Sequence, residues 1–260
     1  MTQDICIVQI TDTHLLATEN DQFIGIRPEQ HFHDILQLIQ QQHSQIDYII
    51  HTGDVAQVAT AEVYARYMQQ MQSLNIPFNH TLGNHDKAEF FPFIGHHNGE
   101  LCVLDFEHWQ IILLNSAISG RVDGEISIQQ LDALQQHLSQ TSKFTLIALH
   151  HHPLLMQSEW IDQHCLKNST ALLHILEQYS QVKICLFGHV HQHFAQQWQH
   201  IHFFAAPASA VQLKPKSKDF SLDDTAPAYR SLILKANGEF DTQVHYLEHF
   251  QKINENCEGY

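Results

Sequence analysis

Five polar clusters in the sequence combine the side chains that most often bind metal ions in proteins. In chain order they are Asp12-Thr-His14, Gly53-Asp54, Gly83-Asn84-His85-Asp86, His150-His-His-Pro153 and Gly188-His189-Val-His191. Histidine is the commonest metal ligand, and carboxylate and amide oxygens complete the usual donor set. If the five clusters meet in space, they predict a metal centre.

The clusters differ in how specific they are, because the chain contains 23 histidines. An Asp-x-His triplet is expected by chance about once in such a chain, and Gly-Asp carries no more information. Gly-His-x-His is expected in roughly one such chain in ten, and Gly-Asn-His-Asp about two times in a thousand. The metal hypothesis therefore depends on the ordered set and not on one match.

The elements that must position these clusters are short apolar runs, each ending where a cluster begins. We expect strands over residues 5–10, 48–50, 77–81, 144–149 and 182–187. In open α/β sheets, functional groups gather at the carboxyl ends of strands. Glycines 53, 83 and 188 allow tight turns and close backbone approach beside the proposed ligands. The five strand ends are thus predicted to converge on one rim.

Amphipathic stretches between these runs predict helices over residues 30–42, 60–74, 127–138 and 169–179. Pro28 suits an early helical position, and Ser127 is a plausible N-cap. Later strands are expected over residues 101–104, 109–114, 201–204, 230–234 and 240–246. This alternation predicts a layered α/β or α+β domain. We expect residues 1–206 to form its core and 207–260 a loop and strand segment completing it.

Composition limits the possible partners and the compartment. The 260 residues carry a formal net charge of −15, which disfavours binding to a nucleic-acid backbone or an anionic membrane. No apolar run is long enough to cross a membrane, and the first residues lack a basic signal-peptide region. The five scattered cysteines include no Cys-x-x-Cys pair and fit a reducing compartment. We therefore expect a cytoplasmic protein.

The ordered clusters resemble the signature of the calcineurin-like, or binuclear, metallophosphoesterase superfamily. The likeness to the bacterial class III 3′,5′-cyclic AMP phosphodiesterases extends to His150-His-His-Pro153, Trp160-Ile-Asp-Gln-His164, Gly188-His-Val-His-Gln192 and Glu258-Gly-Tyr260. The resemblance implies a four-layer αββα sandwich with two metal ions at one edge. It assigns Asp12, His14, Asp54 and His191 to one ion, and Asp54, Asn84, His150 and His189 to the other. Mixed nitrogen and oxygen ligands suit Fe, Mn or Zn better than Mg, and the family implies Fe²⁺ or Mn²⁺.

The resemblance also implies a reaction, the hydrolysis of 3′,5′-cyclic AMP to 5′-AMP by a hydroxide bridging the ions. His85 would act as the catalytic residue by stabilising the phosphoryl group and protonating the leaving 3′-oxygen. His14, Asp54, Asn84, His85 and His191 would contact the substrate. Many relatives carry an acid three residues after the Gly-Asp aspartate to orient the catalytic histidine, but Gln57 stands there. Asp86 or a backbone carbonyl could replace it.

Several assignments stay open at this level. His150, at the strand end, is the preferred ligand over His151 and His152, which we interpret as supporting or pocket-wall groups. Trp160 and His164 form either a packed loop or a wall near the adenine. Lysines 214, 216 and 218 belong either to a solvated loop or to a flap or dimer element. Histidines outside the five clusters, such as His31, His33, His96 and His97, are expected to be structural or on the surface.

Other functions are consistent with parts of the pattern. A broader phosphodiesterase acting on glycerophosphodiesters or cyclic GMP would use the same metal ligands and differ in its pocket walls. A nuclease of the superfamily is disfavoured by the negative charge. A scaffold that keeps the fold without catalysis is also disfavoured, because every expected ligand type is present.

Overall fold

The computed structural model describes residues 4–90 and 101–254. The helices are α1 (Pro28–Gln42), α2 (Ala61–Ser73), α3 (Ile128–Ser139) and α4 (Ser169–Leu176), with a short 3-10 helix, η1 (Ile161–His164). Strands in the first half are β1 (Ile5–Ile10), β2 (Tyr48–His51), β3 (Phe78–His80), β4 (Cys102–Asp105), β5 (Trp109–Leu113) and β6 (Phe144–Ala148). They are followed by β7 (Val182–Phe187), β8 (Phe194–Trp198), β9 (Ile201–Ala205), β10 (Gln212–Leu213), β11 (Leu222–Asp223), β12 (Ala228–Leu234) and β13 (Phe240–Tyr246).

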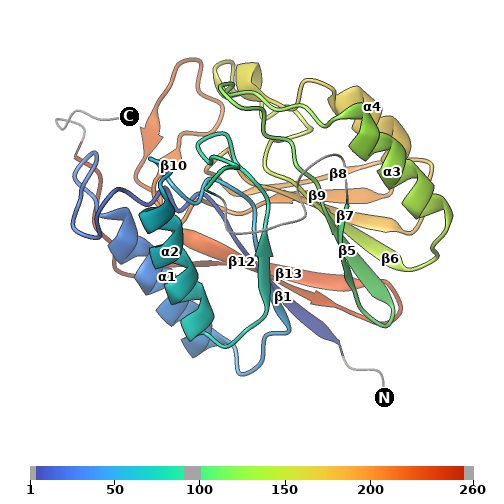
Figure 1. Cartoon of the computed structure of the whole chain (residues 1–260), viewed down its shortest axis with the longest axis horizontal. Coiled ribbons are helices and arrows are strands. Elements are labelled where there is room, and N and C mark those ends of the chain that lie inside the picture. The colour runs from blue at the N-terminus through green and yellow to red at the C-terminus, as the bar shows by residue number, and fades with distance from the viewer. Residues whose placement is uncertain (1–3, 91–100, 255–260) are drawn as a thin grey trace.

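Two sheets of mixed direction form the centre of the molecule (Figure 1). The first has the order β13-β12-β1-β2-β3 and the second β4-β5-β6-β7-β9-β8. Strands β1, β2 and β3 run parallel in the first sheet, as do β5, β6, β7 and β9 in the second. The parallel strands of each sheet therefore present their carboxyl ends at a common edge.

Three apolar clusters hold the layers together. Ile7 and Ile50 of the first sheet pack with Ile111, Leu146 and residues around them in the second, which closes the space between the sheets. A second cluster joins the first sheet to α1 and α2, and a third joins the second sheet to α3 and α4. Burial of apolar surface on both faces of each sheet stabilises this arrangement. The predicted four-layer αββα sandwich is confirmed.

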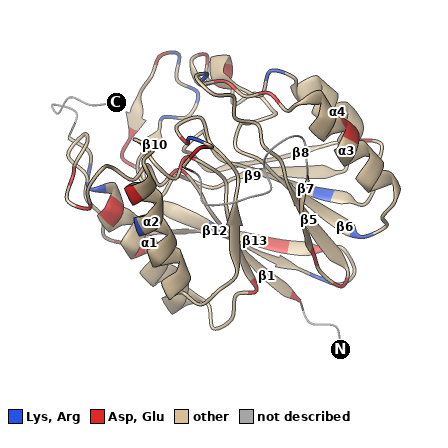
Figure 2. Cartoon of the chain, in the orientation of Figure 1, with Lys and Arg blue, Asp and Glu red and all other residues tan. Residues whose placement is uncertain are grey.

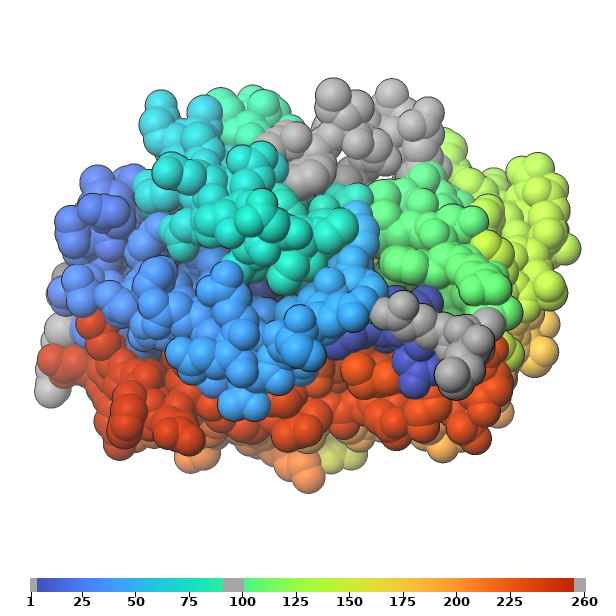
Figure 3. Space-filling model, turned by 90° about the horizontal axis from the view of Figure 1, so that it is seen from below, coloured from blue at the N-terminus to red at the C-terminus, as the bar shows by residue number. Residues whose placement is uncertain are grey.

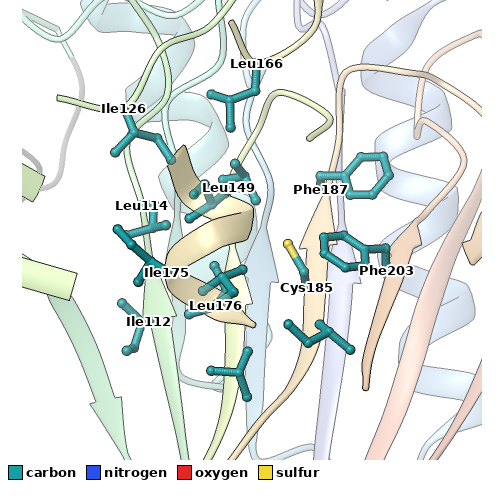
Figure 4. Close-up of a cluster of buried hydrophobic side chains, with 14 of the residues drawn as sticks. Ile112, Leu114, Ile126, Leu149, Leu166, Ile175, Leu176, Cys185, Phe187 and Phe203 are labelled. Atoms are coloured by element: carbon teal, nitrogen blue, oxygen red, sulfur yellow. The ribbon is translucent and has the colours of Figure 1, made fainter. Parts of the chain in front are cut away.

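The outer helices form where the sequence pattern predicts them. In α1 the residues at helical spacing, including Phe32, Ile35 and Ile39, are buried against the first sheet, and Pro28 occupies the first turn. Ser127 caps α3 by accepting a hydrogen bond from the Gln130 backbone N–H, as expected. Figure 4 shows the other outer layer, where Ile175 and Leu176 of α4 gather with Leu149 and Cys185 in one apolar cluster.

The C-terminal segment contributes to the first sheet. Strand β12 pairs antiparallel with β1, aligning Ile7 with Leu232, and β13 pairs with β12. Figure 3 shows residues of this segment, in orange and red, lying along the N-terminal third, in blue. The predicted boundary at residue 206 between a core and a completing segment stays a prediction. Because the C-terminal strands pair with β1, we propose that both parts form one domain.

Sequence reasoning missed or misplaced a few elements. Strand β8 escaped prediction because its central residues are polar and exposed at the sheet edge, so it has no apolar signature. Helix α4 ends at Leu176 and not at residue 179, because Gln178 and Tyr179 donate to carbonyls three residues back in a tighter turn. The closing residues 258–260 and histidines 96 and 97 lie outside the described residues. Within the described ranges, no helix has the length and apolar character that a membrane span requires.

Candidate metal centre

The five polar clusters follow strands β1, β2, β3, β6 and β7, and the structure brings them together at one edge. Among the described residues, four groups of three side chains have potential metal-ligating atoms within 4.8 Å of one another, and each group contains ligands predicted from the sequence. The groups are Asp12, His14 and His191; Asp12, Asp54 and His150; His14, Asp54 and His85; and His150, His151 and His189. Residues as far apart in the chain as Asp12 and His191, which are separated by 191 − 12 = 179 positions, thus meet at one site.

The backbone at this edge is strained where the proposed ligands stand. Asp12, His14, Asp54, His189 and His191 all have φ between 45° and 70°, in the left-handed region that non-glycine residues rarely adopt. Each such residue costs of order 1–3 kcal/mol and persists only where the surroundings impose it. The fold therefore tolerates backbone strain at five residues, and this strain turns their side chains toward a common point.

Two glycines make the close packing of these loops possible. A Cβ on Gly83 would lie 2.1 Å from Asp54 Oδ1, and one on Gly188 would lie 2.2 Å from Thr11 Oγ1. Contacts this short are not found for real Cβ atoms. A residue larger than glycine at position 83 or 188 would push the Asn84 or His189 loop away from the carboxylates. This agrees with the close backbone approach predicted for these glycines.

In the first group of ligands, two imidazoles face each other beside the carboxylates. His14 Nε2 lies 3.0 Å from His191 Nε2 and 3.8 Å from Asp54 Oδ2, and His191 Nε2 lies 3.3 Å from Asp12 Oδ1. His14 Nδ1 lies 2.6 Å from the Gln57 amide oxygen, and His191 Nδ1 lies 2.8 Å from the Val211 carbonyl. These oxygens only accept hydrogen bonds, so both Nδ1 atoms carry the proton.

This arrangement fits a bound cation. Burial lowers the pKa of His14 to about 3, even though Asp54 opposes the shift, so this ring is neutral near pH 7. Its Nε2 lone pair then points at the second imidazole nitrogen, and two such atoms at 3.0 Å need a cation or a proton between them. Two buried carboxylates beside them supply the compensating negative charge.

The second group also meets Asp54, at the same carboxylate oxygen, Oδ2, that His14 approaches. His150 Nε2 lies 3.3 Å from Asp54 Oδ2 and 3.2 Å from the Asn84 amide oxygen, while its Nδ1 donates to the Thr52 carbonyl at 2.7 Å. The ring of His189 lies 5.0 Å from that of His150, and its buried Nε2 has no hydrogen-bond partner among the described residues. An orphaned buried nitrogen is costly unless a ligand or an ion completes the site.

Electrostatics in this group depend on Asp54. Burial lowers the pKa of His150, but the carboxylates of Asp54 and Asp12 outweigh it and raise the pKa to about 9. Burial alone would raise the pKa of Asp54, yet His150 and His85 hold it well below its usual range. These carboxylates therefore favour a proton on His150 at neutral pH, and a cation bound beside Asp54 would compete with that proton.

His85 lies beside both groups but is bound through its backbone. Its N–H donates to Asp54 Oδ1 at 2.8 Å, and its ring packs edge-on against His14 with centroids 5.0 Å apart. The suggestion that Asp86 orients this ring is wrong in this structure. Both oxygens of Asp86 accept hydrogen bonds from the Val55, Ala56 and Gly83 backbone and from the Tyr64 hydroxyl. Asp86 therefore ties the Asn84 loop to the Asp54 loop instead.

The other two histidines of the triplet have different environments. His151 is anchored through Nδ1 to Ser116 Oγ at 2.8 Å and through Nε2 to the Val122 carbonyl at 3.1 Å. His152 Nε2 lies 3.4 Å from Asp162 Oδ1, and its ring stacks on His189. Of the three histidines, only His150 contacts both Asp54 and Asn84, so the geometry supports His150 as the proposed metal ligand.

The remaining sequence candidates, Trp160, His164 and the lysine loop, lie in two loops that pack against each other. Trp160 donates from Nε1 to Ser217 Oγ at 3.1 Å and meets Phe220 edge-on, with centroids 5.1 Å apart. His164 packs against Trp160 at 6.1 Å. The loop that carries lysines 214, 216 and 218 is thus pinned at Ser217 to the start of η1.

Sequence reasoning missed the groups that hold the imidazoles. Gln57 was considered only in relation to His85, but it contacts His14. The Thr52 and Val211 carbonyls that fix His150 and His191 carry no sequence signal, because every residue has a carbonyl. Tyr64 reaches Asp86 from α2, far from any motif.

With this geometry established, comparison with known proteins gives the class. The calcineurin-like phosphoesterase family matches residues 6–193, which include all five clusters. The chain belongs to this family. The fold agrees: a dimetal phosphatase from Danio rerio aligns over 89% of this chain and 96% of its own, with a TM-score of 0.61 and 14% identity. A purple acid phosphatase from yellow lupin aligns over 94% of this chain and 54% of its own, with a TM-score of 0.66 and 12% identity.

More specific relatives are bacterial enzymes of nearly the same length. The 3′,5′-cyclic adenosine monophosphate phosphodiesterase CpdA of Vibrio vulnificus is 40% identical over 94% of this chain and 90% of its own. The protein of the same name from Haemophilus influenzae is 37% identical over 98% and 95%. A 3′,5′-cyclic-nucleotide phosphodiesterase from Nostoc is 35% identical over 92% and 91%.

Proposed function

We propose that this chain is a 3′,5′-cyclic-nucleotide phosphodiesterase that hydrolyses 3′,5′-cyclic AMP to 5′-AMP. The observation that carries the proposal is full-length similarity to cyclic AMP phosphodiesterases combined with an intact set of converging ligands. A fold alone would leave the reaction open, since the same architecture serves many functions. The similarity extends over 94% of this chain, so it is not confined to the metal-binding motifs.

We propose two divalent cations, Fe²⁺ or Mn²⁺, as cofactors. Asp12, His14, Asp54 and His191 would hold one ion, and Asp54, Asn84, His150 and His189 the other. When bound, such a pair activates the attacking water and polarises the phosphate. Asp54 suits the shared position because it lies within 4 Å of imidazoles from both groups.

The chain's own residues then account for the rest of the hydrolysis. The oxygen of water forms a bond to phosphorus, and the bond from phosphorus to the 3′-oxygen breaks. His85 would donate a proton to that leaving oxygen, which gives a free 3′-hydroxyl and a 5′-phosphate. Its backbone N–H is bound by Asp54, its ring packs against His14, and its ligand atom lies within 4.8 Å of those of both residues, although neither proposed ligand set includes it. His14, Asp54, Asn84 and His191 would complete the phosphate-binding surface.

We also propose that the enzyme works in the reducing cytoplasm. The four cysteines among the described residues are free thiols, and two of them, Cys6 and Cys185, are buried. In Figure 2 the positions of acidic and basic residues are interspersed along the ribbon of the described chain. A polynucleotide substrate finds no electrostatic support in this pattern.

Comparing three substrates tests the function. With Mn²⁺ or Fe²⁺ supplied, we expect the highest kcat/KM for cyclic AMP, a lower value for cyclic GMP, and little turnover of glycerophosphocholine. Preferential hydrolysis of glycerophosphocholine would favour the broader phosphodiesterase instead. No hydrolysis of any phosphodiester would contradict the enzymatic proposal and leave a binding scaffold.

A further inference from the structure

A further feature of the site is the way its histidines are held. Three of the four proposed ligand imidazoles donate their Nδ1–H to a neutral oxygen: His150 to the Thr52 carbonyl, His191 to the Val211 carbonyl, and His14 to the Gln57 amide. Groups that hold a ligand imidazole fix its tautomer and tune its basicity. Two of these acceptors are backbone atoms, which a substitution cannot remove.

Gln57 is therefore the side chain in this set through which the sequence can adjust an imidazole. It lies 2.6 Å from His14 Nδ1, the shortest of the three contacts. Its backbone position is fixed as well. The ladder between β1 and β2 continues past both strands, with the His14 N–H on the Asp54 carbonyl, the Leu15 N–H on Val55 and the Gln57 N–H on Leu15. The half-buried Gln57 side chain reaches back from this ladder to His14.

From this geometry we infer that Gln57 is a positioning residue for the first metal ion. It holds the His14 ring so that the Nε2 lone pair faces the carboxylates of Asp12 and Asp54, and it adds no charge to the site. The inference rests on the metal centre of the proposed function and goes beyond it. An acidic residue here would add a carboxylate to a site that already has two. Gln57 offers the imidazole an uncharged acceptor, so the ion is held with an affinity that an acid would raise.

Gln57→Leu and Gln57→Glu test this inference in the full-length, Mn²⁺-loaded protein. Chelator challenge with EDTA gives the release rate of each ion, and competition with a fluorescent chelator gives the affinities. We expect Gln57→Leu to weaken one of the two ions by about 10–100-fold, the usual cost of losing such a partner. Gln57→Glu should restore or exceed wild-type retention of that ion.

Gln37→Leu is the matched control. Gln37 also contacts a histidine, His33, at 2.9 Å, but on the exposed face of α1. This change should leave Mn²⁺ retention as in the wild type. Thermal unfolding of the EDTA-treated proteins separates a local effect from loss of the fold, and we expect similar midpoints for all variants.

Wild-type retention of both ions in Gln57→Leu would overturn the inference, as would equal losses in Gln57→Leu and Gln37→Leu. If the wild type bound two ions but hydrolysed no cyclic nucleotide, the proposed function would fail while the role of Gln57 stood. If the wild type bound no ion, both would fail.

Discussion

The two groups of proposed ligands share Asp54 but differ in charge and in support. The first contains a second buried carboxylate, Asp12, and two imidazoles whose Nε2 atoms lie 3.0 Å apart. The second adds only the neutral amide of Asn84 to its imidazoles. In the metal-free chain the second group keeps a proton on His150, since the pKa of that ring is raised to about 9.

This difference predicts that the two proposed ions would not be held equally. Carboxylates attract a divalent cation more strongly than a neutral amide does, and a proton must leave His150 before the second ion binds. The first ion should therefore be retained more tightly than the second. Four changes would break or sharpen this comparison.

The largest effect is expected from Asp54→Ala, because this residue belongs to both groups. Metal analysis should find neither ion retained after gel filtration, and cyclic AMP hydrolysis should fall to the uncatalysed background. The exposed Asp105, whose carboxylate pairs only with Lys143 among the described ion pairs, provides the control Asp105→Ala. Full metal content in Asp54→Ala would show that the shared carboxylate is not a ligand.

His85→Ala tests the residue that lies beside both groups. We expect two ions to remain while kcat falls by about 10²–10⁴-fold, the usual contribution of a general acid. Steady-state kinetics and metal analysis of the same preparation give both quantities. His174→Ala, at an exposed position on α4, should change neither. Loss of metal in His85→Ala would instead make this residue a ligand.

Asn84→Ala separates the two sites directly. Its amide oxygen contacts His150 of the second group, so we expect one ion to be lost and one retained. Titration with Mn²⁺ followed by electron paramagnetic resonance should then show one tight site. Asn20→Ala, in the exposed loop before α1, is the control. Simultaneous loss of both ions would mean that the sites are not separable.

The smallest effect is expected from pH. Because the pKa of His150 is about 9, this imidazole holds its proton at neutral pH in the metal-free chain. Binding the second ion must release it, so apparent affinity should rise about tenfold per pH unit between pH 7 and 9 and level off above. The pKa of His14 is about 3, so the first ion should show no such dependence on this ring. Calorimetric titration in buffers of different ionisation enthalpy counts the protons released.

Much of this architecture could be predicted from the sequence. Apolar runs and amphipathic periods located α1–α4 and most strands, since burial on one face of a helix or both faces of a strand leaves a local pattern. Strand β8 could not be found in this way, because its exposed edge position imposes no pattern. The short β10–β11 pair also lacks a recognisable sequence pattern, because two residues in each strand are too few to show a period.

The proposed ligands were predictable for a different reason. Each one directly follows a strand in the chain, and parallel strands bring their carboxyl ends together whatever the loops do. The groups that hold those ligands were not predictable. Asp86 was one of two alternatives for orienting the His85 ring, the other being a backbone carbonyl, but it ties two loops together, and Gln57 contacts His14.

The sequence by itself therefore determined which residue types reach the edge of the sheets and, through the ordered motifs, which family the chain belongs to. Only the tertiary structure decided which imidazole faces Asp54, which nitrogen of each ring carries the proton, and how five strained residues share one point. Those properties depend on contacts between residues as far apart as Asp12 and His191, 179 positions, and on backbone carbonyls, neither of which leaves a trace in local composition or spacing.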